Sequence, residues 1–331
     1  MSLNDKIKTK GYLDIDLPLN MDFKSEIEKL KKEKNAIILG HYYQTEDIQE
    51  ISDILGDSLA LAQEAAKTNA DLIVFAGVHF MAETAKMVNP GKKVVLPDLN
   101  AGCSLADSAP ADDFEKFVKA HPDHKVITYI NSSTEVKALT DICVTSSNAV
   151  QIVESFPEDE KLIFAPDKNL GSYINKLTGR NMLLWDGACH VHKEFSLPRL
   201  LELKKENPEA LIIAHPECQS DLLIMADHIG STSSLLKFTQ TNENNSFIVA
   251  TESGILHQMR KASPNKTFIP APPEDSTCAC NDCKFMKLNT LRKIYLAMKY
   301  EVPEIIIEEE LRKKANRPIQ NMLELSRELG L

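Results

Sequence analysis

Three cysteine-bearing segments share a form that suits metal binding or nucleophilic chemistry. The segments are KVVLPDLNAGC, MLLWDGACHVH and TFIPAPPEDSTCACNDC, and they carry Cys103, Cys189 and Cys283. An apolar run followed by Pro, Asp or Gly is typical of a buried strand that ends in a turn. Three cysteines just beyond strand ends therefore predict one shared site.

The expected donors of that site are thiolates, because seven cysteines is an odd number in a long chain, which favours free or metal-bound thiols over disulfides. The CACNDC cluster has the spacing of half a zinc site, but zinc takes four ligands and no second CxxC follows. Three thiolates without a fourth fit a four-iron cluster with one open iron better. Cys143 has no counterpart in the other segments and is expected to be a small buried hydrophobe.

Three copies of one small α/β unit are expected to position these cysteines. His41, Asn131 and His215 each follow the first strand of a copy and lie 90 and 84 residues apart. Strands are expected at 36–39, 72–77, 94–96, 126–130, 162–165, 182–185, 211–214, 247–250 and from residue 267. Such buried runs alternating with helical segments predict parallel sheets covered by helices. The expected bounds are a lead-in and helix at 1–35, units at 36–108, 109–195 and 196–300, and a helical tail at 301–331.

A binding site for anions is expected where helices begin. Ligands of α/β units gather beyond the carboxyl ends of the strands, where Ser58, Ser146 and Thr232 open the next helices. Helix amino termini carry unpaired N–H groups and about half a positive charge, which favours carboxylate or phosphate. The alternative for each of the three residues is a plain helix cap.

Composition excludes several classes of function. The formal charge of −10 opposes a general nucleic-acid surface, which needs clustered Lys and Arg. The start of the sequence, MSLNDKIKTK, is polar, and no apolar run approaches the roughly 18 residues of a membrane span. These features predict a cytoplasmic protein without nucleic-acid or membrane partners.

Ordered motifs between Ala36 and Met298 identify a resemblance. They are GHYYQ, GDSLALAQEA, FAGVHFMAETAK, LPDLNAGCSLADS, YINSSTEVKA, FAPDKNLG, WDGACHVH, HPEC, IGSTSSLLKF, ATESGILH and CKFMKLNTL. In these motifs the chain resembles the type A quinolinate synthases, iron–sulfur enzymes of de novo NAD biosynthesis. The resemblance implies an α/β fold of three pseudo-threefold-related three-layer units, each with a short parallel sheet, around a central [4Fe-4S] site.

The resemblance also implies the ligands of that cluster. They are Cys103, Cys189 and Cys283, one from each unit. Cys283 is preferred to Cys278 and Cys280 because it directly precedes the family's KFMKLN-like run. A secondary hypothesis is that Cys280 and Cys283, a CxxC pair, join as a disulfide under oxidising conditions.

The implied reaction condenses iminoaspartate with dihydroxyacetone phosphate to give quinolinate, phosphate and two waters. The open iron would act as a Lewis acid. Tyr43, His215 and Glu217 would transfer protons, whereas Tyr42 and Tyr43 taken alone suggest packing. The residues that would line the substrate cavity are His41, Tyr129, Asn131 and His192, and the anion-binding residues would be Ser58, Ser146 and Thr232. An aspartate-oxidising enzyme is a candidate partner that supplies iminoaspartate.

Two other classes of protein remain open from the sequence. A different cluster-dependent hydro-lyase shares the open iron but would accept a hydroxy acid alone. A noncatalytic metal-binding or storage protein would have no need of acid–base residues at strand ends.

Overall fold

A computed structural model describes residues 3–275 and 282–331, so Cys278 and Cys280 lie outside the described residues. The chain forms two compact units, which are described separately. The first consists of Met1–Cys103 and Lys284–Asn316, and the second of Ser104–Cys283 and Arg317–Leu331. Among the described residues, no helix is both long enough and apolar enough to span a membrane.

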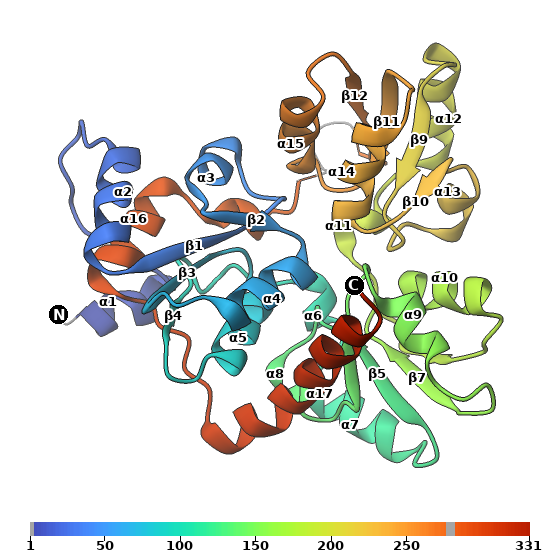
Figure 1. The fold of residues 1–331 in the computed structure, drawn as a ribbon, viewed down its shortest axis with the longest axis horizontal. Helices are drawn as coiled ribbons and strands as arrows, with labels where there is room; N and C mark the ends of the chain where they lie inside the picture. Colours follow the sequence, from blue (N-terminus) through green and yellow to red (C-terminus); the bar gives the residue numbers. More distant parts are fainter. Residues whose placement is uncertain (1–2, 276–281) are drawn as a thin grey trace. The chain divides into compact units, whose positions relative to one another are not determined.

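The first unit contains one parallel sheet with the strand order β2-β1-β3-β4. Its strands are β1 (Ala36–His41), β2 (Ile54–Gly56), β3 (Leu72–Ala76) and β4 (Lys93–Val95). Its helices are α1 (Leu3–Lys10), α2 (Phe23–Glu33), α3 (Glu46–Ile51), α4 (Ser58–Lys67), α5 (His79–Val88), the 3-10 turn η1 (Met286–Leu288) and α16 (Leu291–Tyr300). Helices α2 and α16 pack together on one face of the sheet and α4 and α5 cover the other (Figure 1). Because both faces are covered, every residue of β3 is buried.

The second unit contains two further parallel sheets of the same order, β6-β5-β7-β8 and β10-β9-β11-β12. Their strands are β5 (Lys125–Tyr129), β6 (Ile142–Val144), β7 (Leu162–Ala165), β8 (Leu183–Leu184), β9 (Leu211–Ala214), β10 (His228–Ile229), β11 (Ser246–Ala250) and β12 (Thr267–Pro270). Their helices are α6 (Ser104–Asp107), α7 (Ala111–Lys119), α8 (Thr134–Lys137), α9 (Ala149–Glu154), α10 (Lys168–Thr178), α11 (His190–Lys193), α12 (Leu197–Glu206), α13 (Ser220–Ile224), α14 (Thr232–Thr241) and α15 (Ile255–Ala262).

The helices around these two sheets repeat the layering of the first. Helices α7 and α8 share an apolar cluster with β5 and β7, and α12 and α13 share one with β9 and β11. On the other faces α9 pairs with α10, and α14 pairs with α15. Three sheets with helices on both faces confirm the predicted α/β class and the predicted threefold repetition.

A side-chain bond that occurs once in each repeat shows how closely the three copies correspond. In every copy an aspartate just before the edge strand accepts a hydrogen bond from a main-chain N–H of the central strand, 15 residues earlier. The pairs are Asp53 with Ile38, Asp141 with Val126 and Asp227 with Ile212, each at 2.8 Å. In each sheet this hydrogen bond holds the start of the edge strand beside the central strand.

The edge strands β2, β6 and β10 were not expected from the sequence. Each has only two or three residues, too few for a recognisable apolar pattern. The sequence predicts a loop for the acidic TEDIQE segment, but it forms helix α3, because Ile48 and Ile51 are three residues apart and both are buried. Hydrophobic spacing therefore outweighs the acidic composition here.

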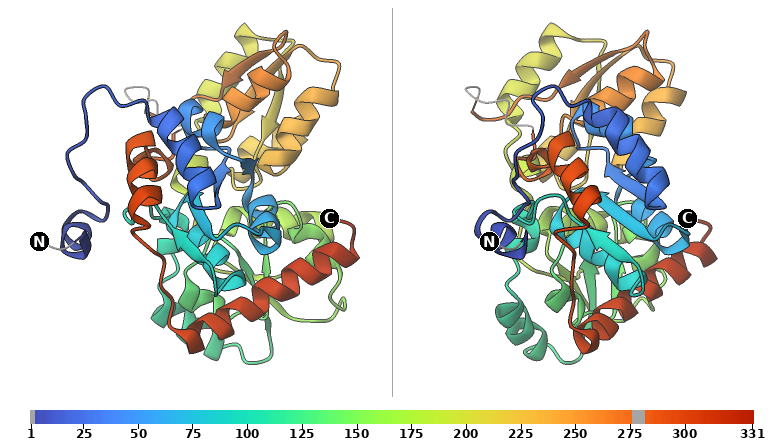
Figure 2. Two further views of the ribbon diagram at one scale, coloured as in Figure 1. Left: turned by 60° about the vertical axis from the view of Figure 1, so that its left-hand side comes forward. Right: turned by 90° about the vertical axis from the view of Figure 1, so that its left-hand side faces the viewer.

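The long helix α17 (Glu309–Glu328) is continuous through Pro318 (Figure 2). One side of it is fully buried at Ala315, Ile319 and Met322, so it is not the purely surface helix that its charges suggest. The expected domain bounds at residues 36, 109, 196 and 301 stay a prediction.

Candidate active site

A buried carboxylate with three polar neighbours, one of which is hydrogen-bonded to it, lies in the second unit. Glu217 follows the end of β9 by three residues and is 2% exposed. Tyr129, the last residue of β5, donates its hydroxyl hydrogen to Glu217 Oε1 at 2.7 Å. The ring atoms His192 Nδ1 and His215 Nδ1 lie 3.1 Å from Oε2 and 3.6 Å from Oε1. Two strand ends and helix α11 thus bring an acid, a phenol and two imidazoles together.

The electrostatics of this group favour the ionised form of Glu217. Burial by itself raises the pKa of the Glu217 carboxyl. The charges of His192 and His215 when protonated, together with the Tyr129 hydroxyl, outweigh burial and lower that pKa to about 2. Burial, and then the charge of Glu217, raises the pKa of the neighbouring Asp167 carboxyl well above its ordinary value. The pKa values of the two buried carboxyls are therefore shifted in opposite directions.

The histidines of the group are oriented by further contacts. The rings of His192 and His215 are stacked with centroids 4.7 Å apart. His192 Nε2 lies 3.0 Å from Thr251 Oγ1, and His215 Nε2 lies 3.2 Å from Ser146 Oγ. His215 Nδ1 accepts the main-chain N–H of Glu217, so in that arrangement Nε2 carries the proton toward Ser146.

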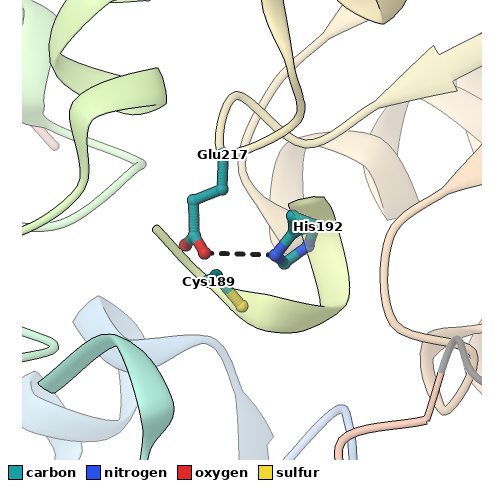
Figure 3. A group of neighbouring side chains, drawn as sticks. All are labelled: Cys189, His192 and Glu217. Atoms are coloured by element: carbon teal, nitrogen blue, oxygen red, sulfur yellow. Dashed lines mark ion pairs between the residues drawn. The ribbon is translucent and has the colours of Figure 1, made fainter. Parts of the chain in front are cut away.

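A cysteine completes the group. The Sγ atom of Cys189, a ring nitrogen of His192 and a carboxylate oxygen of Glu217 all lie within 4.8 Å of one another. Figure 3 shows Glu217 pointing toward His192, with the Cys189 side chain beside them. Thiolate, imidazole and carboxylate are all metal ligands, so these three residues can hold a metal ion.

The first unit carries a related arrangement at the end of β1. His41, 3% exposed, accepts the main-chain N–H of Tyr43 at Nδ1 at 3.1 Å. Their ring centroids are 4.5 Å apart and nearly perpendicular. Lys287 Nζ donates to the Tyr43 carbonyl oxygen at 2.8 Å. Tyr43 therefore stands two residues after a strand-end histidine, as Glu217 stands two residues after His215.

Two of the three expected helix starts are confirmed and one is wrong. Ser58 and Thr232 are the first residues of α4 and α14. Capping falls to the residues before them, because Asp57 and Ser231 accept the free N–H groups of these helices. Ser146 lies in a turn before α9, which begins at Ala149.

Helix α9 begins late because of a local hydrogen bond. The side-chain oxygen of Asn148 accepts the main-chain N–H of Thr145 at 2.6 Å and closes a separate turn over these residues. Asn131 follows β5, and its side-chain oxygen is buried without a hydrogen-bond partner within the described residues. Such an acceptor is available to a donor group on a ligand.

The free cysteines of the described residues fall into two classes. Cys143 and Cys218 are fully buried, and burial raises the pKa of the Cys143 thiol to about 12 and that of Cys218 well above its ordinary value. Cys103, Cys189 and Cys283 are partly exposed. Metal binding requires a thiolate, so the accessible three suit a metal and the buried two do not.

Four residues that contact candidate site residues had not been picked out from the sequence: Asp167, Thr251, Glu252 and Lys287. All lie in family-like motifs, FAPDKNLG, ATESGILH and CKFMKLNTL. Their partners are main-chain groups or side chains far away in the sequence, which no spacing reveals.

Parallel sheets whose strand ends carry accessible thiols and a buried acid–base group define a class, the α/β enzymes with a potential metal site. Comparison with known proteins identifies one family within this class. The family model "Quinolinate synthetase A protein" (NadA) matches residues 25–324, and the chain belongs to this quinolinate synthase family.

Curated relatives agree with the family model over nearly their whole length. The quinolinate synthase of Thermosynechococcus vestitus is 59% identical over 309 residues, which cover 93% of this chain and 97% of the relative. That of Trichormus variabilis is 59% identical, covering 93% and 95%, and that of Chloroherpeton thalassium is 58% identical, covering 94% and 97%. The protein is therefore an enzyme of this family.

Proposed function

We propose that the protein makes quinolinate from iminoaspartate and dihydroxyacetone phosphate, with release of phosphate and two waters, in de novo NAD biosynthesis. The observation that carries the proposal is Glu217, a buried carboxylate contacted by Tyr129, His192 and His215 beside the Cys189 thiol. This reaction requires several proton transfers without net oxidation. A group that combines a carboxylate, a phenol and imidazoles suits such transfers.

The proposed cofactor is a [4Fe-4S] cluster held by Cys103, Cys189 and Cys283. Its support is the chemistry of the donors, since these are the accessible thiols among the described cysteines. When bound, the cluster would supply an open iron as a Lewis acid.

The protein's own residues would move protons and orient the substrates. The Glu217 carboxylate stays ionised and stabilises the protonated form of His215 during proton transfer, while the Tyr129 hydroxyl donates to that carboxylate. His215 exchanges protons at Nε2, which already faces the Ser146 hydroxyl. In the first unit Tyr43 would be a second proton donor and acceptor beside His41.

The substrates would be held by hydroxyl and amide groups. We assign His41, Asn131 and His192 to the lining of the cavity, together with Tyr129. Ser58, Ser146 and Thr232 would bind carboxylate or phosphate, and loss of one hydrogen bond to such a group costs about 1.5–3 kcal/mol. Alanine at each of these three should raise KM roughly tenfold or more without loss of iron. Unchanged kinetics in all three variants would show that these three residues have only a structural role.

The decisive test is anaerobic purification with iron and sulfide counts, followed by a quinolinate assay. We expect activity only when both carbon substrates are supplied. Conversion of a hydroxy acid alone would identify a different hydro-lyase, and iron binding without any turnover would identify a storage protein.

Variants of the cysteines test the cofactor in the same preparation. Cys103→Ala, Cys189→Ala and Cys283→Ala should each abolish cluster assembly, while Cys143→Ala should keep it. If Cys283→Ala retains iron and Cys280→Ala loses it, the third ligand is Cys280 and not Cys283.

The proposed setting is the cytoplasm, with an aspartate-oxidising enzyme as the source of iminoaspartate. Iminoaspartate hydrolyses readily as an imine, so a nearby supplying enzyme would raise the yield. Quinolinate yield from aspartate, measured with both enzymes together and with the two separated by a dialysis membrane, tests this partnership.

A further inference from the structure

Asp167 links a cysteine to the start of a helix. It lies two residues beyond the end of β7 and is fully buried. Its Oδ1 accepts the main-chain N–H of Leu170 in the first turn of α10 at 2.8 Å. Its Oδ2 accepts the main-chain N–H of Cys189 at 3.2 Å, 22 residues further along the chain. One carboxylate thus connects the helix to the segment that carries the thiol.

Glu252 makes the same connection in the next repeat. It lies two residues beyond the end of β11 and is also fully buried. Its Oε2 accepts the main-chain N–H of Gly254, directly before α15, at 2.7 Å. Its Oε1 accepts the main-chain N–H of Cys283 at 3.0 Å, 31 residues further along the chain. The position in the sheet, the burial and the cysteine partner match those of Asp167, and the other partner again lies at the start of the following helix.

The first repeat uses a main-chain bond in place of a carboxylate. The residue two positions beyond β3 is Val78, which has no polar side chain. Instead the N–H of His79, at the start of α5, donates to the carbonyl oxygen of Ala101 at 2.7 Å, two residues before Cys103. All three repeats therefore tie the start of the helix after the third strand to the cysteine segment.

Helix capping alone does not explain these two carboxylates. A cap needs one oxygen, as Ser133 shows by accepting the N–H of Val136 in α8 with its single hydroxyl. Asp167 and Glu252 each use the second oxygen on a cysteine N–H far along the chain. Burying a carboxylate is costly unless its oxygens are hydrogen-bonded, so both links must be kept for the residue to be tolerated.

We propose that Asp167 and Glu252 are positioning residues that fix the main chain of Cys189 and Cys283 for binding of the cluster. The inference rests on the proposed function, because it needs those two cysteines to be ligands. Outer contacts that orient metal ligands typically change metal retention 10- to 100-fold when removed. The two carboxylates hold the ligand segments in place without touching the metal.

The test compares the rate of iron release to a ferrous chelator, followed by absorbance under anaerobic conditions, in the loaded wild-type protein and in variants. Asp167→Asn and Glu252→Gln retain shape but present an NH₂ group to one of the two N–H donors, so each loses one link. We expect both to release iron about tenfold faster or more. Two independent variants keep the test usable if one of them does not fold.

The matched control is Asp57→Asn, the buried cap of α4 in the first unit, which should release iron at the wild-type rate. Equal acceleration in Asp57→Asn would show general loosening and overturn the inference, as would wild-type release rates in both test variants. A wild-type chain that binds no iron and sulfide would overturn the proposed function and this inference with it.

Discussion

Tyr129→Phe tests the hydrogen bond between Tyr129 and Glu217 in the buried group. The substitution removes one oxygen, which donates a hydrogen bond to Glu217 at 2.7 Å, and leaves the ring in place. Tyr129 is only 4% exposed, so water cannot replace the lost donor without opening the site. Hydrogen bonds to charged groups contribute about 1.5–3 kcal/mol, and the free energy of unfolding should fall by about that amount.

Thermal unfolding followed by circular dichroism measures this loss. For a unit of this size, about 1.5–3 kcal/mol corresponds to a decrease in Tm of roughly 3–12 °C. The matched control is Tyr173→Phe in the same unit, since Tyr173 packs at the edge of an apolar cluster and not against Glu217. That variant should differ from wild type by less than about 0.5 kcal/mol.

A double-mutant cycle identifies the partner. If the Tyr129 hydroxyl acts through the Glu217 carboxylate, adding Tyr129→Phe to Glu217→Gln should cost much less than it costs alone. A Tyr129→Phe protein as stable as Tyr173→Phe, or strictly additive effects in the cycle, would refute the reasoning.

Three further expectations concern Tyr43, Lys287 and the two buried cysteines. Tyr43→Phe should keep the fold and the iron but lower quinolinate turnover roughly a hundredfold or more, as for a lost acid–base group, while Tyr42→Phe should be nearly silent; near-normal turnover in Tyr43→Phe would assign that residue to packing. Lys287→Met should lower kcat about tenfold or more, because it removes the hydrogen bond to the Tyr43 carbonyl oxygen. Lys287→Arg should recover part of the lost kcat. A wild-type kcat in both variants would show that the contact is unimportant. Iodoacetamide at pH 8 should leave Cys143 and Cys218 unlabelled in the folded protein, because burial raises the pKa of both thiols, and mass mapping that finds either one labelled contradicts this.

The fold was largely predictable because its signals are local. Apolar runs such as LIVFA and LIFA are recognisable in the sequence and become the buried strands β3 and β7. The edge strands were missed because two or three residues carry no pattern. The start of α9 was misplaced because one side-chain bond of Asn148 decides it.

The contacts within the site were less accessible to sequence reasoning. Tyr129 and Glu217 are 88 residues apart, and only the folded chain shows that they are bonded. Asp167 and Glu252 bond to main-chain N–H groups, which every residue except proline provides, so no partner type marks them. The roles of the site residues came from the family resemblance and remain to be tested.

The division of the first unit between the two ends of the chain has a consequence for synthesis of the protein. One face of its sheet is covered by α2 and by α16, whose residues Ile294 to Met298 are buried in that core. At about 5–20 residues per second, α16 leaves the ribosome roughly 10–40 s after Cys103. During this interval the face of β1 and β3 that α16 will cover is exposed, so a nascent or truncated chain needs a chaperone more than the finished protein does.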